Sequence, residues 1–539
     1  MSRASDGNSP VPPLAVYALT ALAIGVVWWW LGMPVTLPPS PLAEGGKLYC
    51  VSYAPFRGSQ NPMVEGTRVT PERIDQDLAF LSHYTNCVRT YSVDDVHDDV
   101  LQSARRYGLK VLYGTWVSNN PEKTRRQIAS TVAYAKAYPD VIRAIVVGNE
   151  VLLRGEMSPA DLIAYIRDVK SQVSMPVTYA DVWEFWLRYP DVQNAVDFVS
   201  IHILPYWEDF PIPATIAAAH VDAIRKKVAV AMPNKEIVIG EFGWPSAGRM
   251  REGARPSPSN QARVISETLA LAQRENYRVN VIEAFDQPWK RWLEGAVGGH
   301  WGIFDRAAQA PKFGFGGVVS DHPHWPMQAL AGILLAALTF GAAWMGGRGK
   351  DAPPLLWLRI AALVLLPAIL FGWTLETVPA ESFSAGSWLR NLAFAATAAA
   401  APIVCAAACA AGRPLPAFAA LLGRGGDRRG FAMALGASFI ALTLLSVQTA
   451  LGLVFDPRYR DIPFAAQSAA VIPFFVLMLS TQRVAGARAM AEMLAAAVLA
   501  VAAGYIVFNE SFANWQAIWL CAGFAGLAVI LLRARVAPG

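Results

Sequence analysis

The chain has 539 residues, of which 54% are hydrophobic, with a mean hydropathy of +0.31 and a formal net charge of only +5. This length argues against a single domain and predicts two or more. The small net charge gives no reason to expect a nucleic-acid partner. The five cysteines form no metal-binding pattern, so we expect neither a metal nor a cofactor.

The N-terminal part is predicted to be a membrane anchor. Polar residues 1–13 precede an uninterrupted apolar run of 18 residues, Leu14 to Leu31, which is long enough to span a bilayer. The run ends in three tryptophans, as at a membrane interface, and no clear cleavage site follows. We therefore expect a cytoplasmic tail and an uncleaved anchor over residues 1–33, then a stiff proline-rich linker over residues 34–46.

From residue 47 to about residue 320, short β-type runs alternate with amphipathic helical stretches. The expected strands are 48–53, 86–91, 110–115, 143–148, 176–179, 197–203, 236–240 and 279–284. The expected helices include 71–84, 96–107, 121–138, 159–172, 216–231 and 259–275. Eight strand–helix units in about 270 residues predict an α/β fold, a (β/α)8 TIM barrel. An open doubly wound sheet ranks second, because no G-x-G-x-x-G loop follows the first strand.

The remainder, residues 321–539, is predicted to be an all-α polytopic membrane domain. Seven apolar runs are long enough to span, namely 327–345, 355–374, 388–411, 430–455, 463–480, 489–508 and 513–532. If the N-terminus is inside, the inner loops carry ten basic residues and the outer loops carry two. The positive-inside rule then predicts eight helices, both termini in the cytoplasm and the barrel outside it.

Two apolar strands of the expected barrel end in glutamates. One reads Ile145-Val-Val-Gly-Asn149-Glu150 and the other Ile237-Val-Ile-Gly240-Glu241. Residues at the carboxyl ends of barrel strands line the active site, so Glu150 and Glu241 are expected to meet. Two carboxyl groups about 5–5.5 Å apart perform glycoside hydrolysis with retention, and Asn149 is placed to hydrogen-bond a sugar 2-hydroxyl. The alternative is that each glutamate is a solvated loop residue.

Eight segments of this region resemble family 17 glycoside hydrolases, a branch of the retaining barrel enzymes. They read VSYAPFR (51–57), NCVRTYSVD (86–94), LKVLYGTW (109–116), VVGNEVLLRGE (146–156), VTYADVW (177–183), GEFGWPSAG (240–248), EAFDQPWK (283–290) and HWGIFD (300–305). The resemblance is greatest to fungal-type and bacterial β-1,3-glucan-active members. It implies Glu150 as acid/base and Glu241 as nucleophile. The chain departs from the family at Gln287, where an acid is common, and at Phe242, where many members have threonine.

Further residues near strand ends are candidates for binding sugar. Aromatic rings offer stacking faces, although some must belong to the core; the candidates are Tyr206, Trp244, Trp289, Trp116 and Trp183. Tyr206 is also placed to hydrogen-bond Glu241. Arg57 and Asp94 end strands one and two and are candidates for sugar hydroxyls, with a buried ion pair between strands as the alternative.

Two other side-chain types have open interpretations. His202 is either a support for the site or a satisfied core histidine. Cys50 and Cys87 lie in expected strands, and the first interpretation is a pair of buried thiols. A Cys50–Cys87 disulfide formed outside the cytoplasm is the alternative.

The whole layout of anchor, barrel and multi-helix tail resembles the NdvC-like group of bacterial membrane β-(1→6)-glucan synthases. This implies a multi-pass protein of the bacterial inner membrane with its catalytic domain in the periplasm. The expected cytoplasmic loops are too short for a nucleotide-sugar donor site, so any synthesis is expected to proceed by transglycosylation. We predict a double displacement on β-1,3-glucan that forms β-1,6 linkages or branches, with β-glucan donor and acceptor and the lipid bilayer as partners.

Two alternative functions are kept. One is a plain endo- or exo-β-1,3-glucanase with the same site. The other is a glucan-binding translocation or scaffold protein, whose partner would be a separate glucan polymerase.

Overall fold

The computed structural model describes residues 13–64, 66–96, 98–347, 353–422, 430–481 and 486–536. The chain divides into two compact units. The barrel unit comprises Pro34–Ala247 and Gly253–Val319. The helical unit comprises Met1–Met33, Gly248–Glu252 and Ser320–Gly539.

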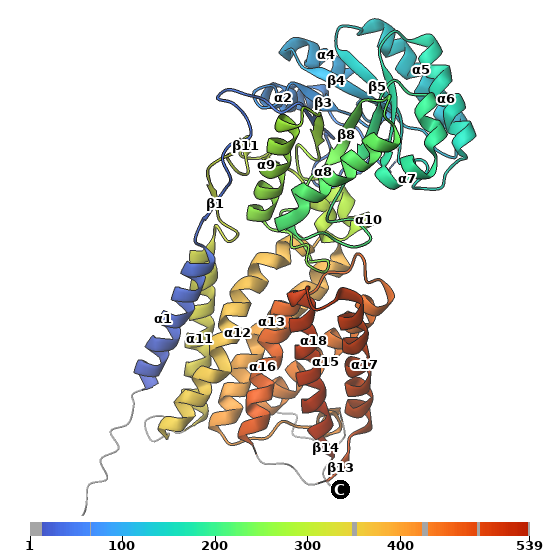
Figure 1. Ribbon diagram of the computed structural model, residues 1–539. Coiled ribbons are helices and arrows are strands. Elements are labelled where there is room, and N and C mark those ends of the chain that lie inside the picture. The colour runs from blue at the N-terminus through green and yellow to red at the C-terminus, as the bar shows by residue number, and fades with distance from the viewer. Residues whose placement is uncertain are drawn as a thin grey trace, which may run out of the picture. The chain divides into compact units, whose positions relative to one another are not determined.

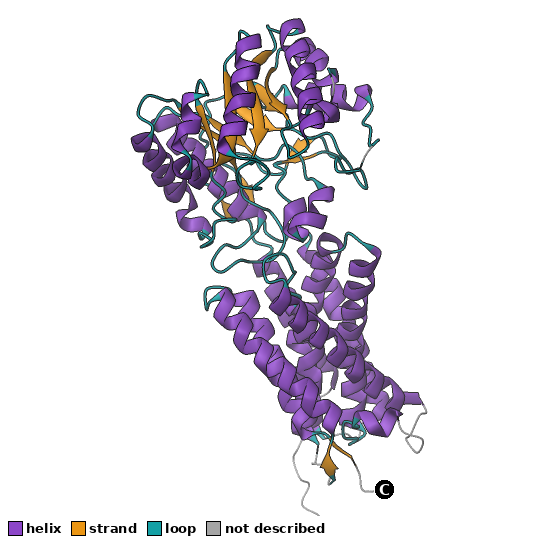
Figure 2. Ribbon diagram, turned by 90° about the vertical axis from the view of Figure 1, so that its right-hand side faces the viewer, coloured by secondary structure: helices purple, strands orange, loops and turns teal. Residues whose placement is uncertain are grey.

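The barrel unit contains a closed barrel of eight parallel strands that pair in chain order, with the first strand also pairing with the last. The strands are β2 (Cys50–Ser52), β3 (Cys87–Arg89), β4 (Lys110–Thr115), β5 (Ile142–Asn149), β6 (Val177–Val182), β7 (Val199–His202), β8 (Ile237–Phe242) and β9 (Val279–Val281). Figure 2 shows these strands surrounded by helices. The predicted TIM-type barrel is therefore confirmed, and the open sheet is excluded.

The barrel unit has six longer helices, four of which begin at a proline. These are α2 (Pro71–Leu81), α4 (Asp99–Tyr107), α5 (Pro121–Ala137), α6 (Pro159–Gln172), α8 (Ala214–Ala231) and α9 (Pro258–Arg274). Proline suits the first helical turn because its missing N–H needs no partner there; it opens α2, α5, α6 and α9. The short helices α3 (Val93–Val96), α7 (Trp183–Arg188) and α10 (Arg291–Glu294) were not predicted.

Alternating strand residues divide the barrel into two apolar layers. Residues such as Val51 and Val88 point outward and join the large core between strands and helices. The inward residues form a separate small cluster, which is Cys50, Cys87, Leu112, Ala144, Val146 and Ala180. Cys50 and Cys87 form a disulfide in this cluster, so the buried-thiol interpretation is wrong for this pair.

The proline-rich segment predicted as a spacer is instead paired. Its strand β1 (Val35–Thr36) runs antiparallel to β12 (Val318–Val319) at the end of the barrel unit, and the N–H of Leu37 donates to Gly317 O at 3.0 Å. A second antiparallel pair joins β10 (Phe304–Asp305) and β11 (Ala310–Pro311). The backbone pairing explains why residues 34–46 belong to the barrel unit.

The helical unit is a bundle whose long helices run side by side (Figure 1). They are α1 (Pro13–Leu31), α11 (Trp325–Gly346), α12 (Pro354–Glu381), α13 (Ala385–Ala410), α15 (Gly430–Phe455), α16 (Phe464–Ser480), α17 (Met490–Glu510) and α18 (Trp515–Arg533). By length and composition, seven of the described helices could cross a membrane, and α16, with 17 residues, is a shorter apolar helix.

Each predicted apolar run is found as a helix, with one correction at α12. This helix continues to Glu381, seven residues beyond the predicted end at residue 374, so most of the expected 375–387 loop is helical. The short helix α14 (Phe418–Leu422) and the strand pair of β13 (Ala487–Arg488) and β14 (Arg535–Val536) were not expected. Six loop residues used for the orientation lie outside the described residues, namely Arg348, Lys350, Arg424, Arg428, Arg429 and Arg483.

Candidate active site

The two predicted glutamates meet at the carboxyl ends of their strands. Glu150 follows β5, and Glu241 lies near the end of β8 with 5% of its surface exposed. One carboxylate oxygen of each, together with a ring nitrogen of His202, lie within 4.8 Å of one another. The alternative, that each glutamate is a solvated loop residue, is therefore wrong.

His202, at the end of β7, links the pair. Its Nδ1 lies 2.8 Å from Oε1 of Glu150, and its Nε2 lies 3.2 Å from Nη1 of Arg89. A carboxylate can only accept, so Nδ1 carries a hydrogen and donates to Glu150. This hydrogen bond decides the open interpretation of His202 in favour of a supporting role.

Arg89 on β3 is the central residue that the sequence interpretation missed. Its Nη1 donates to the backbone O of Gly240 at 2.7 Å and to Oε1 of Glu241 at 3.1 Å, and its Nη2 donates to Oδ1 of Asn149 at 2.6 Å. The side chain is 1% exposed. The sequence did contain a signal for Arg89: an arginine within an apolar barrel strand is expected to be buried, and a buried charge requires partners.

The backbone conformation at the strand ends orients the side chains of the site. The chain turns at the end of β5 through Gly148, with φ of +85°, and Glu150, with φ of 54°. The β5–β6 and β7–β8 ladders each shift register here, as bulges near active sites often do. At Gly240, a Cβ atom would lie 2.2 Å from Oγ of Ser200 and 3.5 Å from Nη1 of Arg89. A larger residue here would therefore clash with the Ser200 hydroxyl, which would have to move.

Burial and the neighbouring side chains shift the pKa of Glu150 in opposite directions. Burial favours its neutral form, but the hydrogen bond from His202 and the electrostatic attraction of His202, Arg154 and Arg89 outweigh burial and lower the pKa of Glu150. Asp181, at the end of β6, behaves differently. Burial raises the pKa of Asp181 to about 6, the hydrogen bond from Tyr179 opposes this rise, and the Glu150 carboxylate adds to it.

A second acidic group follows β9. Lys290 is paired with Glu283, and burial raises the pKa of Glu283 although Lys290 opposes it. Burial raises the pKa of Glu294 to about 7; Lys290 opposes the rise, and the carboxylates of Glu283, Glu150 and Glu241 add to it. The sequence interpretation selected only Trp289 from this segment and missed all three charged residues.

The aromatic candidates divide into two groups. Tyr206 and Trp244 are fully buried and pack edge to face with ring centroids 6.2 Å apart. The indole N–H of Trp244 donates to Arg255 O at 3.1 Å. Neither ring presents an exposed face on which a sugar could stack, so the prediction that they face sugar is wrong and both belong to the hydrophobic core.

The other three candidates are half-buried, and their sugar contacts stay predictions. The indole of Trp289 donates to Oε1 of Gln287 at 3.0 Å, and the indole of Trp183 donates to Glu208 at 3.2 Å. The guanidinium of Arg154 lies 4.5 Å from the ring centroid of Trp116.

Arg57 is explained by an ion pair. It pairs with Asp77, a fully buried residue of α2. The ion-pair alternative is therefore right, although the partner comes from a helix and not from a neighbouring strand. Asp94 is exposed, and its role stays a prediction. Gln287, where family members commonly have an acid, is buried and donates to Ala54 O at 3.0 Å and Phe285 O at 3.2 Å.

Glu150, His202 and Glu241 are close enough to hold a cation by distance alone. However, both ring nitrogens of His202 are already engaged, and the guanidinium of Arg89 occupies the cationic position beside Glu241. This donor set does not fit a metal, and we assign none.

The part of the chain that forms the barrel is similar in sequence to known proteins. Residues 50–302 match the family model described as BtgE/BtgC glycoside hydrolase domain. The glucan 1,3-beta-glucosidase of Arthroderma benhamiae is 29% identical over 262 residues, which cover 44% of this chain and 82% of that protein. The glucan 1,3-beta-glucosidase of Saccharomyces cerevisiae is 25% identical over 263 residues, covering 44% and 84%.

Solved structures are similar over the same part of the chain. A glycoside hydrolase family 17 beta-1,3-glucanosyltransferase from Rhizomucor miehei is 26% identical, covers 49% of this chain and 95% of that chain, and has a TM-score of 0.43. An endo-laminarinase from Formosa Hel1_33_131 is 22% identical, covers 49% and 84%, and has a TM-score of 0.42.

Over residues 50–302 the chain is therefore similar to glycoside hydrolases, and it is an enzyme. The family match leaves out residues 1–33 and 320–539, which make up nearly all of the helical unit, so it says nothing about what the helical unit does.

Proposed function

We propose that this protein acts on β-1,3-glucan as a retaining glucosidase or glucanosyltransferase. The observation that carries the proposal is the separation of Glu150 and Glu241, whose nearest carboxylate oxygens lie within 4.8 Å. Retaining pairs are about 5–5.5 Å apart, whereas inverting pairs need about 6.5–9.5 Å to admit a water molecule. The named activity of the fungal relatives supports a β-1,3-glucan substrate.

The hydrogen bonds of Glu241 and Asn149 show which of their atoms are free to act on the sugar. Arg89 holds Oε1 of Glu241, so Oε2 is the atom that attacks the anomeric carbon. Glu150 gives its proton to the leaving oxygen and later accepts one from the incoming hydroxyl. Oδ1 of Asn149 is occupied by Arg89, which leaves the amide NH2 to donate to the sugar 2-hydroxyl.

His202 favours the second half of this reaction. By donating to Glu150 it stabilises the carboxylate form, which is the form that removes a proton from the acceptor. The first half needs Glu150 protonated, so the sugar that enters must offset this effect by excluding water from the carboxyl group.

The proposal extends to transfer. A sugar hydroxyl in place of water would resolve the glucosyl-enzyme and form β-1,6 linkages or branches. Support comes from the resemblance of the whole layout to the NdvC-like β-(1→6)-glucan synthases and from Trp292 on α10, which is 62% exposed and has an aromatic face of the kind that binds sugar rings.

We also place the protein in the bacterial inner membrane, with the barrel in the periplasm. The apolar helices support the membrane by length and composition. The Cys50–Cys87 disulfide supports a compartment outside the cytoplasm, because disulfides persist where conditions are oxidising.

Linkage analysis tests hydrolysis against transfer. The purified full-length protein is incubated with laminari-oligosaccharides, and transfer predicts products longer than the donor that contain β-1,6 bonds. Shorter β-1,3 products and glucose alone would contradict transfer and leave a plain glucanase. The Glu241→Gln variant should form no product and should not restore glucan in deficient cells; full restoration would favour the scaffold alternative.

A further inference from the structure

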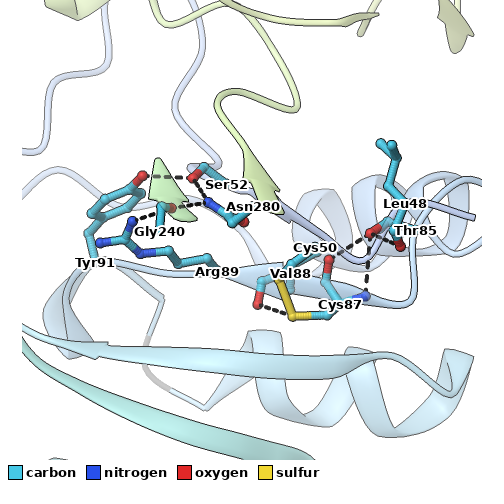
Figure 3. The surroundings of a disulfide bond; sticks show 10 residues. All are labelled: Leu48, Cys50, Ser52, Thr85, Cys87, Val88, Arg89, Tyr91, Gly240 and Asn280. Atoms are coloured by element: carbon cyan, nitrogen blue, oxygen red, sulfur yellow. Dashed lines mark hydrogen bonds between the residues drawn. A yellow bond between two sulfur atoms is a disulfide. The ribbon is translucent and has the colours of Figure 1, made fainter. Parts of the chain in front are cut away.

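Figure 3 shows the Cys50–Cys87 disulfide beside the strand segment that carries Arg89. The two cysteines sit on β2 and β3, each of which has only three residues. The backbone ladder between these strands comprises two residue pairs, Val51 with Val88 and Ser52 with Arg89. The bond is therefore a covalent link across one of the shortest ladders of the barrel.

The ladder on the other side of β2 is also short, although backbone hydrogen bonds from Tyr53 N–H to Arg89 O and from Ala284 N–H to Ser52 O continue the pairing beyond the two ladders. It closes the barrel by pairing with β9 over two positions, Cys50 with Asn280 and Val51 with Val281. By contrast, β4 and β5 pair over five positions. The disulfide thus strengthens the seam at which the first and last strands meet.

The residues two positions along each strand face the same interior. Cys50 is followed by Ser52, and Cys87 is followed by Arg89. Both cysteines are fully buried within the inner apolar cluster, while Ser52 and Arg89 begin the polar network of the active site. The spacing of β2 and β3 at the disulfide therefore sets the spacing of Ser52 and Arg89.

Arg89 contacts the backbone O of Gly240 directly, and Ser52 is linked to the same atom through Asn280. Asn280 donates to Oγ of Ser52 at 2.8 Å and to the backbone O of Gly240 at 2.7 Å, and Arg89 donates to the same O of Gly240 at 2.7 Å. Oγ of Ser52 lies 2.7 Å from the hydroxyl of Tyr91, whose ring centroid lies 4.8 Å from the Arg89 guanidinium. Gly240 immediately precedes Glu241, so this network reaches the nucleophile.

We propose that the Cys50–Cys87 disulfide is a positioning device for catalysis, which fixes β2 against β3 so that Ser52 and Arg89 hold Gly240 and Glu241 in the attacking geometry. This inference rests on the proposed function for its kinetic test. It assigns the disulfide a role beyond stability, because hydrogen bonds to a buried charge weaken steeply when their distance or angle changes.

The first test removes the bond. The Cys50→Ala/Cys87→Ala variant of the full-length protein should lose about tenfold in kcat on laminari-oligosaccharides, with KM changed less than twofold, because an interaction with the reacting groups is lost and the outer sugar contacts are kept. Assays are run where circular dichroism shows the variant folded. The matched control is Cys521→Ala, which removes a buried free thiol of the helical unit and should leave kcat at the wild-type value.

A double-mutant cycle separates positioning from stability. If the disulfide acts through Arg89, its removal in the Arg89→Lys background should cost less than twofold, because the same pathway is already broken. Equal losses in both backgrounds would overturn the proposal. The alkaline limit of kcat/KM provides a second readout: it should move to higher pH in the disulfide variant, because Arg89 lowers the pKa of Glu150. An unmoved limit would also overturn the proposal.

A third measurement needs no substrate and therefore distinguishes failure of this inference from failure of the proposed function. Amide hydrogen exchange is followed in the peptide that contains Gly240 and Glu241. We expect exchange at least tenfold faster in the disulfide variant than in the wild type and in Cys521→Ala. Unchanged exchange in this peptide, or free thiols at Cys50 and Cys87 in the protein purified from membranes, would overturn the proposal.

Discussion

Glu150 works from a backbone conformation that few glutamates adopt. Its φ of 54° is left-handed, which costs a non-glycine residue roughly 1–2 kcal/mol. Two backbone bonds hold it there: its N–H donates to Ala180 O at 2.8 Å, and its O accepts from the N–H of Arg154 at 2.9 Å. Strained residues of this kind cluster at active sites, and here the strain turns the carboxyl group towards His202.

The two carboxylates should differ in their response to the leaving group. Glu150→Gln should lower kcat/KM on laminari-oligosaccharides by on the order of 10²–10⁴-fold, because general acid–base catalysis is lost. With a dinitrophenyl β-glucoside, whose leaving group needs no proton, the glucosylation step should be nearly unaffected. Glu241→Gln should abolish activity on both substrates. A burst of dinitrophenol measures that step, and equal loss for both variants would contradict the assigned roles.

Removing His202 should change the pH profile in a stated direction. His202→Ala deletes the hydrogen bond that stabilises ionised Glu150, so the pKa of Glu150 rises. The acid form then persists to higher pH, and the alkaline limit of kcat/KM moves upward. The control is His220→Ala, since His220 lies on α8 and contacts Glu208, 3.2 Å away, and this variant should keep the wild-type limit.

Asp181 should make the barrel sensitive to pH. Its pKa is raised from 3.8 to about 6, so the folded state favours the protonated acid. This stability is fully present below pH 3.8 and is lost as pH rises through 6, by about 3 kcal/mol at 1.36 kcal/mol per pKa unit. Asp181→Asn removes the titration, so melting temperatures of the wild type should fall more between pH 4 and pH 8 than those of the variant. Parallel curves would contradict this.

At the scale of elements, the helix starts of the barrel unit allow a matched comparison. Ser158 and Thr70 are both N-caps followed by proline, but only the Ser158 side chain accepts a hydrogen bond from the helix, at the N–H of Asp161. Ser158→Ala should therefore cost about 1 kcal/mol. Thr70→Ala should cost much less. Chemical unfolding of the two variants measures the difference, and equal costs would show that the Ser158 bond adds nothing.

Periodicity and turn chemistry made most elements predictable from the sequence. All eight barrel strands and the long helices were found because each buries a regular apolar pattern, and α6 matches its predicted bounds. β1 and β12 were missed because two-residue strands have no period; their pairing joins Val35 to Val319, 284 positions apart in the chain. The end of α12 was misplaced because the polar residues after residue 374 were interpreted as loop.

The site was predictable only in part, and for a similar reason. Glu150 and Glu241 carry a local signal, a polar residue at the end of an apolar strand. The role of Arg89 can be recognised only when β3, β5, β7 and β8 close into a barrel, because its hydrogen-bond partners come from the other three strands. Tyr206 and Trp244 show the reverse case, since an aromatic residue after a strand has the same sequence pattern whether the fold exposes or buries its ring.

For the whole molecule, the proposed orientation in the membrane is open to direct measurement. A phosphatase fused after residue 539 should be inactive, because this end is proposed to be cytoplasmic. A fusion between α12 and α13, at residues 382–384, should be active. The structure shortens the loop available for this second fusion, since α12 extends to Glu381. The opposite pattern of activities would reverse the orientation and place the barrel in the cytoplasm.

The pairing of β1 with β12 has a consequence for the history of the chain. The barrel unit is entered and left through adjacent residues, Val35 and Val319, and within the helical unit the hydroxyl of Ser320 donates to Gly32 O at 2.9 Å. Joining residue 33 to residue 320 would thus close the helical chain across a gap already spanned by one hydrogen bond. A gene fragment encoding residues 34–319 could enter or leave such a chain in one event without rerouting any helix, and it would take only Gly248–Glu252 of the helical unit with it. This junction is therefore the natural place to exchange one enzyme for another.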